Sequence, residues 1–164
     1  MKVLLTGRAG QLGQALVASA PEGVELVATS RAELDLADSA ACCRIVEEQC
    51  PDWVLNAGAY TAVDKAESEP ELALAVNALA PAAFAQALQE QGGRLLQLST
   101  DFVFNGQQGS PYQVDQSRDP LGVYGSTKAK SYAWSLVLAG GSVVASIIPL
   151  GAARSASNFE MKDM

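Results

Sequence analysis

The sequence contains no histidine. This absence excludes Ser-His-Asp and Cys-His nucleophilic catalysis and most zinc sites, so acid–base chemistry must use Tyr, Lys, Asp or Glu side chains. Cysteine is also scarce. Cys42, Cys43 and Cys50 are odd in number and lack the paired spacing of a zinc or redox motif, which favours small apolar residues on a helix. The sequence therefore predicts no metal site.

Aromatic residues make up only 6% of the chain and charged residues 18%, whereas 49% of the residues are hydrophobic. This composition suits a helix-covered parallel sheet better than a β-sandwich, and 164 residues are enough for about one domain. The net charge of −7 disfavours nucleic acid or an anionic membrane as a partner. No apolar run reaches the length of a membrane span and no signal peptide is recognisable, so we expect a cytoplasmic protein.

The first thirteen residues carry the strongest single motif. A short apolar run over Val3–Leu5 is typical of a buried strand, and it is followed by Gly7, Gly10 and Gly13 and then by a helical pattern. Glycines allow the backbone to approach a pyrophosphate, and the N–H groups at the start of a helix point toward it. The alternative is a purely structural turn. The position between a strand and a helix favours a dinucleotide site.

Apolar strand patterns alternate with helical patterns along the chain. The predicted strands are 3–5, 24–29, 53–55, 95–98 and 143–148, and the predicted helices are 11–19, 39–50 with Asp38 or Ser39 as its cap, 67–91 interrupted at Pro81, and 124–138. Such alternation predicts an α/β protein with a doubly wound, Rossmann-like parallel sheet that binds NAD(P). Residues 1–150 would form this domain.

Tyr124 and Lys128 lie four residues apart on one predicted helix and therefore share a face. A nearby ammonium group favours phenolate, so we expect Lys128 to lower the pKa of Tyr124. Thr100 or Ser99, at the end of a predicted strand, is placed to hydrogen-bond a substrate carbonyl while Tyr124 gives or takes its proton. The alternatives are a surface pair and hydroxyls that satisfy a turn.

The end of the second predicted strand bears on the choice of cofactor. An acidic residue at this point would bind a ribose 2′-hydroxyl and repel a phosphate. This chain has Ser30 and Arg31 instead, a hydroxyl and a cation. We therefore predict a preference for NADPH over NADH, with a solvated arginine as the alternative interpretation of Arg31.

Three runs carry a family resemblance: 56–67 (NAGAYTAVDKAE), 99–104 (STDFVF) and 124–128 (YGSTK). Together with the glycine turn, they resemble the dTDP-4-dehydrorhamnose reductases, which are extended short-chain dehydrogenase/reductases. The resemblance is continuous from Met1 to about Lys128. It implies NAD(P)H-dependent reduction of the 4-keto group of dTDP-4-dehydro-L-rhamnose to dTDP-L-rhamnose, a precursor of cell-surface polysaccharide.

The resemblance also implies roles for single positions. Thr100, Tyr124 and Lys128 match the catalytic trio. The pyrophosphate turn is matched by Gly7, Gly10, Gln11 and Leu12. The adenine edge is matched by Asp35 and Leu36, and the wall beside the nicotinamide ribose by Ala57, Ala59 and Tyr60. The predicted cofactor set is completed by Gly13, Ser30, Arg31, Ser99, Tyr124 and Lys128.

After Lys128 the sequence departs from the family pattern. A glutamate on the helix and an arginine at the end of the following strand are absent, and the chain ends at Met164, where members of the family have a further substrate-binding lobe. In the family, this lobe supplies most of the sugar-nucleotide contacts and of the metal-assisted dimer surface, so residues 151–164 would be the remnant of the substrate-binding region. The resemblance implies a dTDP-sugar substrate and a homodimer as partners. We expect a truncated or altered reductase that retains the cofactor chemistry and turns over poorly.

Two other functions remain open. One is a non-catalytic, NADP-binding regulatory subunit that resembles the methionine adenosyltransferase β subunit. The other is a sugar-nucleotide epimerase or dehydratase of the same superfamily. The presence of Thr100, Tyr124 and Lys128 favours an enzyme over a binding module, and the run 63–67 favours the reductase over the epimerase or dehydratase.

Overall fold

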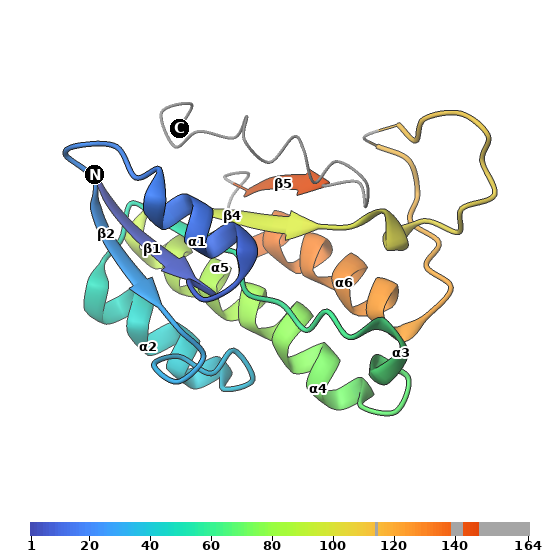
Figure 1. The fold of residues 1–164 in the computed structure, drawn as a ribbon, viewed down its shortest axis with the longest axis horizontal. Helices are drawn as coiled ribbons and strands as arrows, with labels where there is room; N and C mark the ends of the chain where they lie inside the picture. Colours follow the sequence, from blue (N-terminus) through green and yellow to red (C-terminus); the bar gives the residue numbers. More distant parts are fainter. Residues whose placement is uncertain (114, 139–142, 148–164) are drawn as a thin grey trace.

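A computed structural model describes residues 1–113, 115–138 and 143–147, and of 132–138 and 143–147 it describes the backbone alone. Five parallel strands form one sheet in the order β2-β1-β3-β4-β5 (Figure 1). They are β1 (Lys2–Thr6), β2 (Glu25–Thr29), β3 (Trp53–Asn56), β4 (Arg94–Ser99) and β5 (Val143–Ile147). The strand order reverses between β1 and β3, which confirms the predicted doubly wound α/β fold and places a ligand crevice at the carboxyl ends of these strands.

Helices cover both faces of the sheet (Figure 1). On one face, α1 (Gln11–Ala18) packs through Leu16 against Val3, Leu5 and Leu55. On the other face, α2 (Ser39–Gln49) and α5 (Ala80–Gln91) pack against the alternate strand residues. Because helices cover both faces of the sheet, the side chains on both faces must be apolar. Successive strand residues point to opposite faces, which explains the uninterrupted hydrophobic runs of β1 and β3.

The caps of α2 show how local sequence defines an element. The Asp38 carboxylate accepts a hydrogen bond from the Ala41 backbone N–H at 2.9 Å, so Asp38 is the cap rather than Ser39. The helix ends at Cys50, which adopts left-handed backbone angles with φ 44° and is exposed. Cys42 is buried within α2, as expected. The same expectation is wrong for Cys50, which lies beyond the last turn.

The helical segment Pro70–Gln91 is continuous but not uniform. It consists of α4 (Pro70–Leu74), a π-helical turn η1 (Ala75–Leu79) and α5. Pro81 lies in the first turn of α5, as predicted, whereas the irregularity precedes it, because a proline has no N–H to bond the carbonyl four residues earlier. The predicted start at residue 67 is wrong. A separate short helix, α3 (Val63–Ala66), comes before α4.

The same segment, Pro70–Gln91, is long and apolar enough to cross a membrane, so the expectation that no run reaches that length is wrong. Its side chains have another explanation. Of its most apolar 18 residues, 56% are buried within the protein, and Phe84 and Leu88 belong to the core shared with α2. The apolar character of this helix therefore reflects burial in the domain.

The connection between β4 and the last helix is mostly irregular. It begins with a short 3-10 helix, η2 (Asp101–Val103), which the sequence did not predict, and it leads to α6 (Val123–Leu138). Helix α6 lies beside α5 and β4 (Figure 1). The predicted end of the last strand at 148 and the tail 151–164 lie outside the described residues.

Candidate active site

The glycine turn between β1 and α1 is closed by contacts that only glycine permits. Gly7 has φ +70°, and a Cβ atom there would lie 2.7 Å from the backbone nitrogen of Gly58. A Cβ at Gly13 would collide with the carbonyl oxygen of Gly7. Gly10 is the N-cap residue of α1, and its N–H donates to the Gly7 carbonyl at 2.9 Å. The backbone itself therefore forms the cradle that a pyrophosphate needs.

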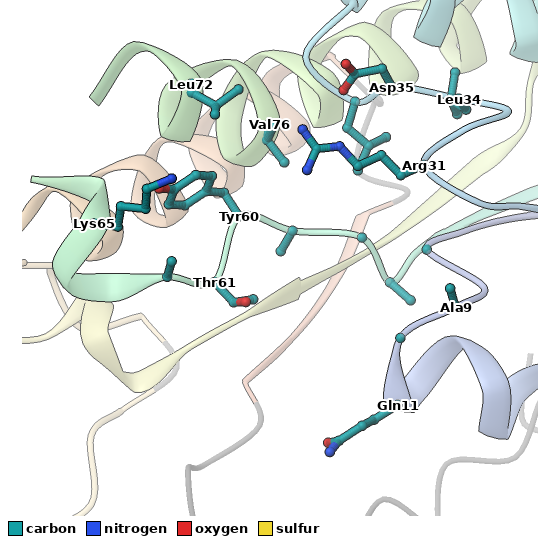
Figure 2. Close-up of a pocket in the computed structure, with 17 residues that line it drawn as sticks. Ala9, Gln11, Arg31, Leu34, Asp35, Tyr60, Thr61, Lys65, Leu72 and Val76 are labelled. Atoms are coloured by element: carbon teal, nitrogen blue, oxygen red, sulfur yellow. The ribbon is translucent and has the colours of Figure 1, made fainter. Parts of the chain in front are cut away.

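A cavity of about 650 Å³ opens beside this turn (Figure 2). It runs between the glycine turn, the loop after β2, the loop after β3 and the start of the helical segment α4–η1. This volume lies within the range of roughly 300–1,000 Å³ that is usual for small-molecule and cofactor sites. The lining residues are Gly7, Ala9, Gly10, Gln11, Arg31, Leu34, Asp35, Leu36, Ala57, Gly58, Ala59, Tyr60, Thr61, Ala62, Lys65, Leu72 and Val76.

Nine predicted cofactor residues line this cavity: Gly7, Gly10, Gln11, Arg31, Asp35, Leu36, Ala57, Ala59 and Tyr60. Other predicted residues lie nearby without lining it. The side chain of Leu12 packs against the core on the α1 face, and Gly13 lies behind Gly7. Both act on the shape of the turn through the backbone and the packing of α1.

Sequence reasoning missed several lining residues, including Gly58, Lys65, Leu72 and Val76. Gly58 had a signal, because it lies within the run that carries the family resemblance. Its position is also restricted, since a Cβ there would come 2.5 Å from Leu36 Cδ1. Leu72 and Val76 had no signal of their own, because their helical periodicity cannot show which side faces a ligand.

The two residues predicted to bind a cofactor phosphate after β2, Ser30 and Arg31, lie in different environments. Arg31 is exposed and reaches over the cavity (Figure 2). The backbone N–H and the hydroxyl of Ser30, however, both donate to Glu33 Oε2, at 2.8 and 2.7 Å. Arg8 Nη2 lies 3.2 Å from the same oxygen. These hydrogen bonds from Ser30, together with Arg8, lower the pKa of Glu33 and hold it ionised.

Thr100 and Tyr124 lie at the end of β4 and the start of α6. The Thr100 hydroxyl is buried, donates to Asp101 Oδ1 at 3.0 Å and accepts the Phe102 N–H at 3.3 Å. The half-buried Tyr124 ring stands edge-on to Phe102, with 5.6 Å between the ring centroids. Ser99, also half-buried, is the last residue of β4.

The charge states of this end of the site differ from the sequence prediction. Burial raises the pKa of Tyr124, which the neighbouring Thr100 hydroxyl only partly offsets. Lys128 is buried, its Nζ donates to the Leu98 carbonyl at 2.7 Å, and burial lowers its pKa to about 8. The predicted lowering of the Tyr124 pKa by Lys128 is therefore wrong for this structure, because desolvation of the phenolate outweighs any effect of the ammonium.

Asn77 joins the two parts of the site and was not predicted. Its Oδ1 accepts the Tyr60 N–H at 2.9 Å, and its Nδ2 donates to the Tyr60 carbonyl at 3.0 Å and to Thr127 Oγ1 at 3.2 Å. The Thr127 hydroxyl in turn donates to the Tyr124 carbonyl. The cavity wall at Tyr60 is thus hydrogen-bonded to the helix that carries Tyr124.

A second buried chain of hydrogen bonds runs across the carboxyl ends of the strands. The Thr6 hydroxyl donates to Asn56 Oδ1, and Asn56 Nδ2 donates to Gln97 Oε1 at 2.6 Å. Gln97 Nε2 donates to the same Leu98 carbonyl that accepts the Lys128 ammonium. Buried polar side chains at three neighbouring strands are therefore satisfied by one another, which fixes the floor of the site.

In the part of the chain that the structure describes, no three His, Cys, Asp or Glu side chains are grouped to hold a metal ion. Thr100, Tyr124 and Lys128 do not line the cavity: they lie at the end of β4 and on α6, whereas the cavity lies at the ends of β1, β2 and β3. A dinucleotide has two halves, and this arrangement offers a cradle for its diphosphate at one end and proton-transferring groups at the other.

Residues 1–140 match the family model described as the RmlD substrate binding domain. The chain belongs to this family. A dTDP-4-dehydrorhamnose reductase of Streptomyces griseus is 48% identical over 126 residues, which are 76% of this chain and 41% of that relative. The chain spans less than half the length of the curated relatives it matches.

Solved structures of other members support the same assignment. A dTDP-4-dehydrorhamnose reductase of Clostridium acetobutylicum superimposes with a TM-score of 0.83 at 33% identity, covering 91% of this chain and 52% of that one. One of Bacillus anthracis, in complex with NADP, has a TM-score of 0.85 at 30% identity, covering 90% of this chain and 53% of the other. The described fold is thus that of about half of an RmlD-family protein.

Proposed function

We propose that this chain binds NADPH and supplies the catalytic residues for reduction of the 4-keto group of dTDP-4-dehydro-L-rhamnose. The observation that carries the proposal is the arrangement along one sheet edge. A glycine cradle and a cavity of about 650 Å³ lie at β1–β3, and Thr100, Tyr124 and Lys128 lie at β4 and α6. The relatives named dTDP-4-dehydrorhamnose reductase support this substrate class.

Tyr124 is the proposed proton donor. A ketone reduction needs a hydride at the carbonyl carbon, which the reduced nicotinamide supplies when bound, and a proton at the carbonyl oxygen. A raised pKa keeps the Tyr124 phenol protonated at neutral pH, which is the form that donates. The adjacent Thr100 hydroxyl would hydrogen-bond the same oxygen as its charge develops.

Lys128 would hold the cofactor ribose and the backbone of β4. Its ammonium group bonds the Leu98 carbonyl, and because an ammonium carries three N–H donors, the other two would bond ribose hydroxyls. Ser99, the last residue of the same strand, is the proposed neighbour on the nicotinamide side. The pyrophosphate would lie on the backbone of Gly7, Gly10 and Gln11 with Leu12 and Gly13 behind, and the adenosine beside Arg31, Asp35 and Leu36.

NADPH is the proposed preferred cofactor and NADH the secondary one. Arg31 places a cation over the cavity at the end of β2, where the ribose 2′-position of a bound dinucleotide lies. The Bacillus anthracis relative was solved with NADP. Residues 1–150 are proposed as the NAD(P)-binding domain of a cytoplasmic enzyme whose partners are the dTDP-sugar and, in a homodimer, a second copy.

Titration of the 164-residue chain with NADPH, followed by nucleotide fluorescence, tests the proposal. Saturable binding that is lost in Gly13→Val supports a dinucleotide site in the glycine turn. Addition of dTDP-4-dehydro-L-rhamnose then tests the chemistry by oxidation of NADPH. Binding without any turnover would favour a regulatory, NADP-binding role, and absence of binding would contradict the proposal.

A further inference from the structure

The loop after β2 contains a carboxylate at the place where a cofactor phosphate is expected. In doubly wound folds, the ribose 2′-position lies beside the end of the second strand. Here that end is Thr29, and the next residues are Ser30 and Arg31. The N–H and hydroxyl of Ser30 and the guanidinium group of Arg8 are gathered here around Glu33, and Arg31 lines the adjoining cavity.

Glu33 already takes three of these donors. A single oxygen, Oε2, accepts the Ser30 N–H at 2.8 Å and the Ser30 hydroxyl at 2.7 Å, and it lies 3.2 Å from Arg8 Nη2. A phosphate uses the same set of partners, namely a backbone N–H, a hydroxyl and an arginine fork. The carboxylate therefore stands in for the anion that these groups would otherwise bind.

Arg8 is held in this position by its backbone as well. Its N–H donates to the Thr29 carbonyl at 3.0 Å, so the glycine turn and the end of β2 are tied together. The side chain of Arg8 also donates from Nη1 to the Ala28 carbonyl at 3.4 Å. Arg31, in contrast, is exposed and faces the cavity (Figure 2).

We propose that Glu33 is a specificity-determining residue that limits the preference of this site for NADPH over NADH by occupying the donors of a 2′-phosphate. Arg31 attracts the phosphate, and Glu33 repels it and competes for Ser30 and Arg8. With the unphosphorylated cofactor, the unused lone pairs of the same carboxylate are available to accept the 2′-hydroxyl. This inference rests on the proposed dinucleotide site and goes beyond it by naming the residue that sets the balance.

The test compares the NADPH and NADH dissociation constants of the wild-type chain, Glu33→Gln and Glu33→Ala. Glu33→Gln removes the charge but keeps a hydrogen-bond acceptor for Ser30, whereas Glu33→Ala frees all three donors. Because a charge-assisted hydrogen bond is worth more than a neutral one, we expect the affinity ratio to shift toward NADPH by about tenfold in Glu33→Ala and less in Glu33→Gln.

Glu25→Gln is the matched control. Glu25 lies at the opposite end of β2 and pairs with Lys2 at 3.4 Å, so the variant also removes one exposed, ion-paired carboxylate. The ratio of its NADPH and NADH affinities should equal that of the wild type. In the Glu33→Ala background, Arg8→Gln should return the ratio toward the wild-type value, because the freed guanidinium is then the gained phosphate ligand.

The outcomes separate the two proposals. A ratio in Glu33→Ala that stays within twofold of wild type, or that shifts toward NADH, contradicts the role of Glu33 while leaving the cofactor site intact. A wild-type chain that binds neither nucleotide contradicts the proposed function and the inference together. Adenosine 2′,5′-bisphosphate and 5′-AMP, titrated in the same variants, show whether the shift arises at the 2′-phosphate, and an equal shift for both would also contradict the inference.

Discussion

The two ends of the site are formed by different kinds of groups. The proposed diphosphate end consists of backbone and small residues, with Gly7, Gly13 and Gly58 at positions where a Cβ does not fit. The proposed catalytic end consists of buried polar side chains, of which Lys128 and Thr100 are almost completely enclosed. The first end depends on steric fit and the second on protonation, so changes at the two ends should fail in different ways.

The largest effect is expected for Tyr124→Phe. The change removes one hydroxyl and leaves the ring contact with Phe102, so the fold and NADPH binding should persist. Loss of the proposed proton donor should lower kcat by about 10²–10⁴. The measurement is NADPH oxidation in the presence of the keto-sugar. Tyr112→Phe, in a ring stacked on Phe104 away from α6, is the control and should retain activity. A Tyr124→Phe variant of normal kcat would exclude Tyr124 as the donor.

Gly13→Ala should disrupt the glycine turn at the other end of the site. The new methyl group would collide with the Gly7 carbonyl and lie 2.7 Å from Arg8 Cα, and both are backbone atoms that cannot move aside without opening the turn. Overpacking of this kind costs about 1–3 kcal/mol of the free energy of unfolding. We expect a lower Tm and weakened NADPH binding together.

Gly109→Ala provides the control for this substitution, since nothing lies within 4 Å of its added Cβ. Its Tm should match that of the wild type. If Gly13→Ala bound NADPH as tightly as the wild type, the close contact between Gly13 and Gly7 would not be what shapes the cradle.

The contrast between the two ends also explains what the sequence could predict. The strands were located to within one or two residues, because their apolar runs end at the polar clusters of the sheet edge. The glycine turn was predictable because steric exclusion leaves only one residue type. Tyr124 and Lys128 were identified by spacing on one helix face.

Other features could not be predicted because they depend on neighbours distant in sequence. The pKa of Tyr124 follows from burial, which no local pattern reports. Asn77 is an asparagine within an apolar helix, and its role depends on Tyr60 and Thr127. The hydrogen bonds that Ser30 donates depend on Glu33, whose carboxylate accepts both of them. The sequence identified residue types at the right strand ends, whereas their partners required the fold.

Lys128→Met tests the electrostatics of the catalytic end through pH. The folded-state pKa of Lys128, about 8, lies below the usual value of 10.5 for a lysine, so the unfolded chain binds more protons between these two pH values. The contribution of Lys128 to stability therefore rises with pH across this window. We expect the stability advantage of Lys128→Met over wild type to fall by about 2 kcal/mol between pH 7 and pH 10.

The comparison with a variant is necessary because other groups act in the opposite direction. Burial raises the pKa of Cys42 to about 12, so the unfolded chain ionises first and the wild type loses stability in alkali. This loss is common to both chains and cancels in the difference. Urea unfolding at several pH values provides the measurement. A difference between Lys128→Met and the wild type that does not change with pH would contradict the burial of Lys128 as a charged group.

The smallest effect is expected where the two ends meet. Asn77 is 1% exposed, and Asn77→Ala would remove the acceptor of the Tyr60 N–H and the donor to the Tyr60 carbonyl and Thr127. Loss of buried hydrogen bonds should cost about 1–2 kcal/mol of the free energy of unfolding. Because Asn77 links the cavity wall to α6, NADPH affinity and kcat should both fall modestly. Asn105→Ala, which removes an exposed hydrogen bond to Asp119, should change neither. If Asn77→Ala altered affinity and left kcat unchanged, the two ends would be independent, and the position of Tyr124 would have to come from α6 packing alone.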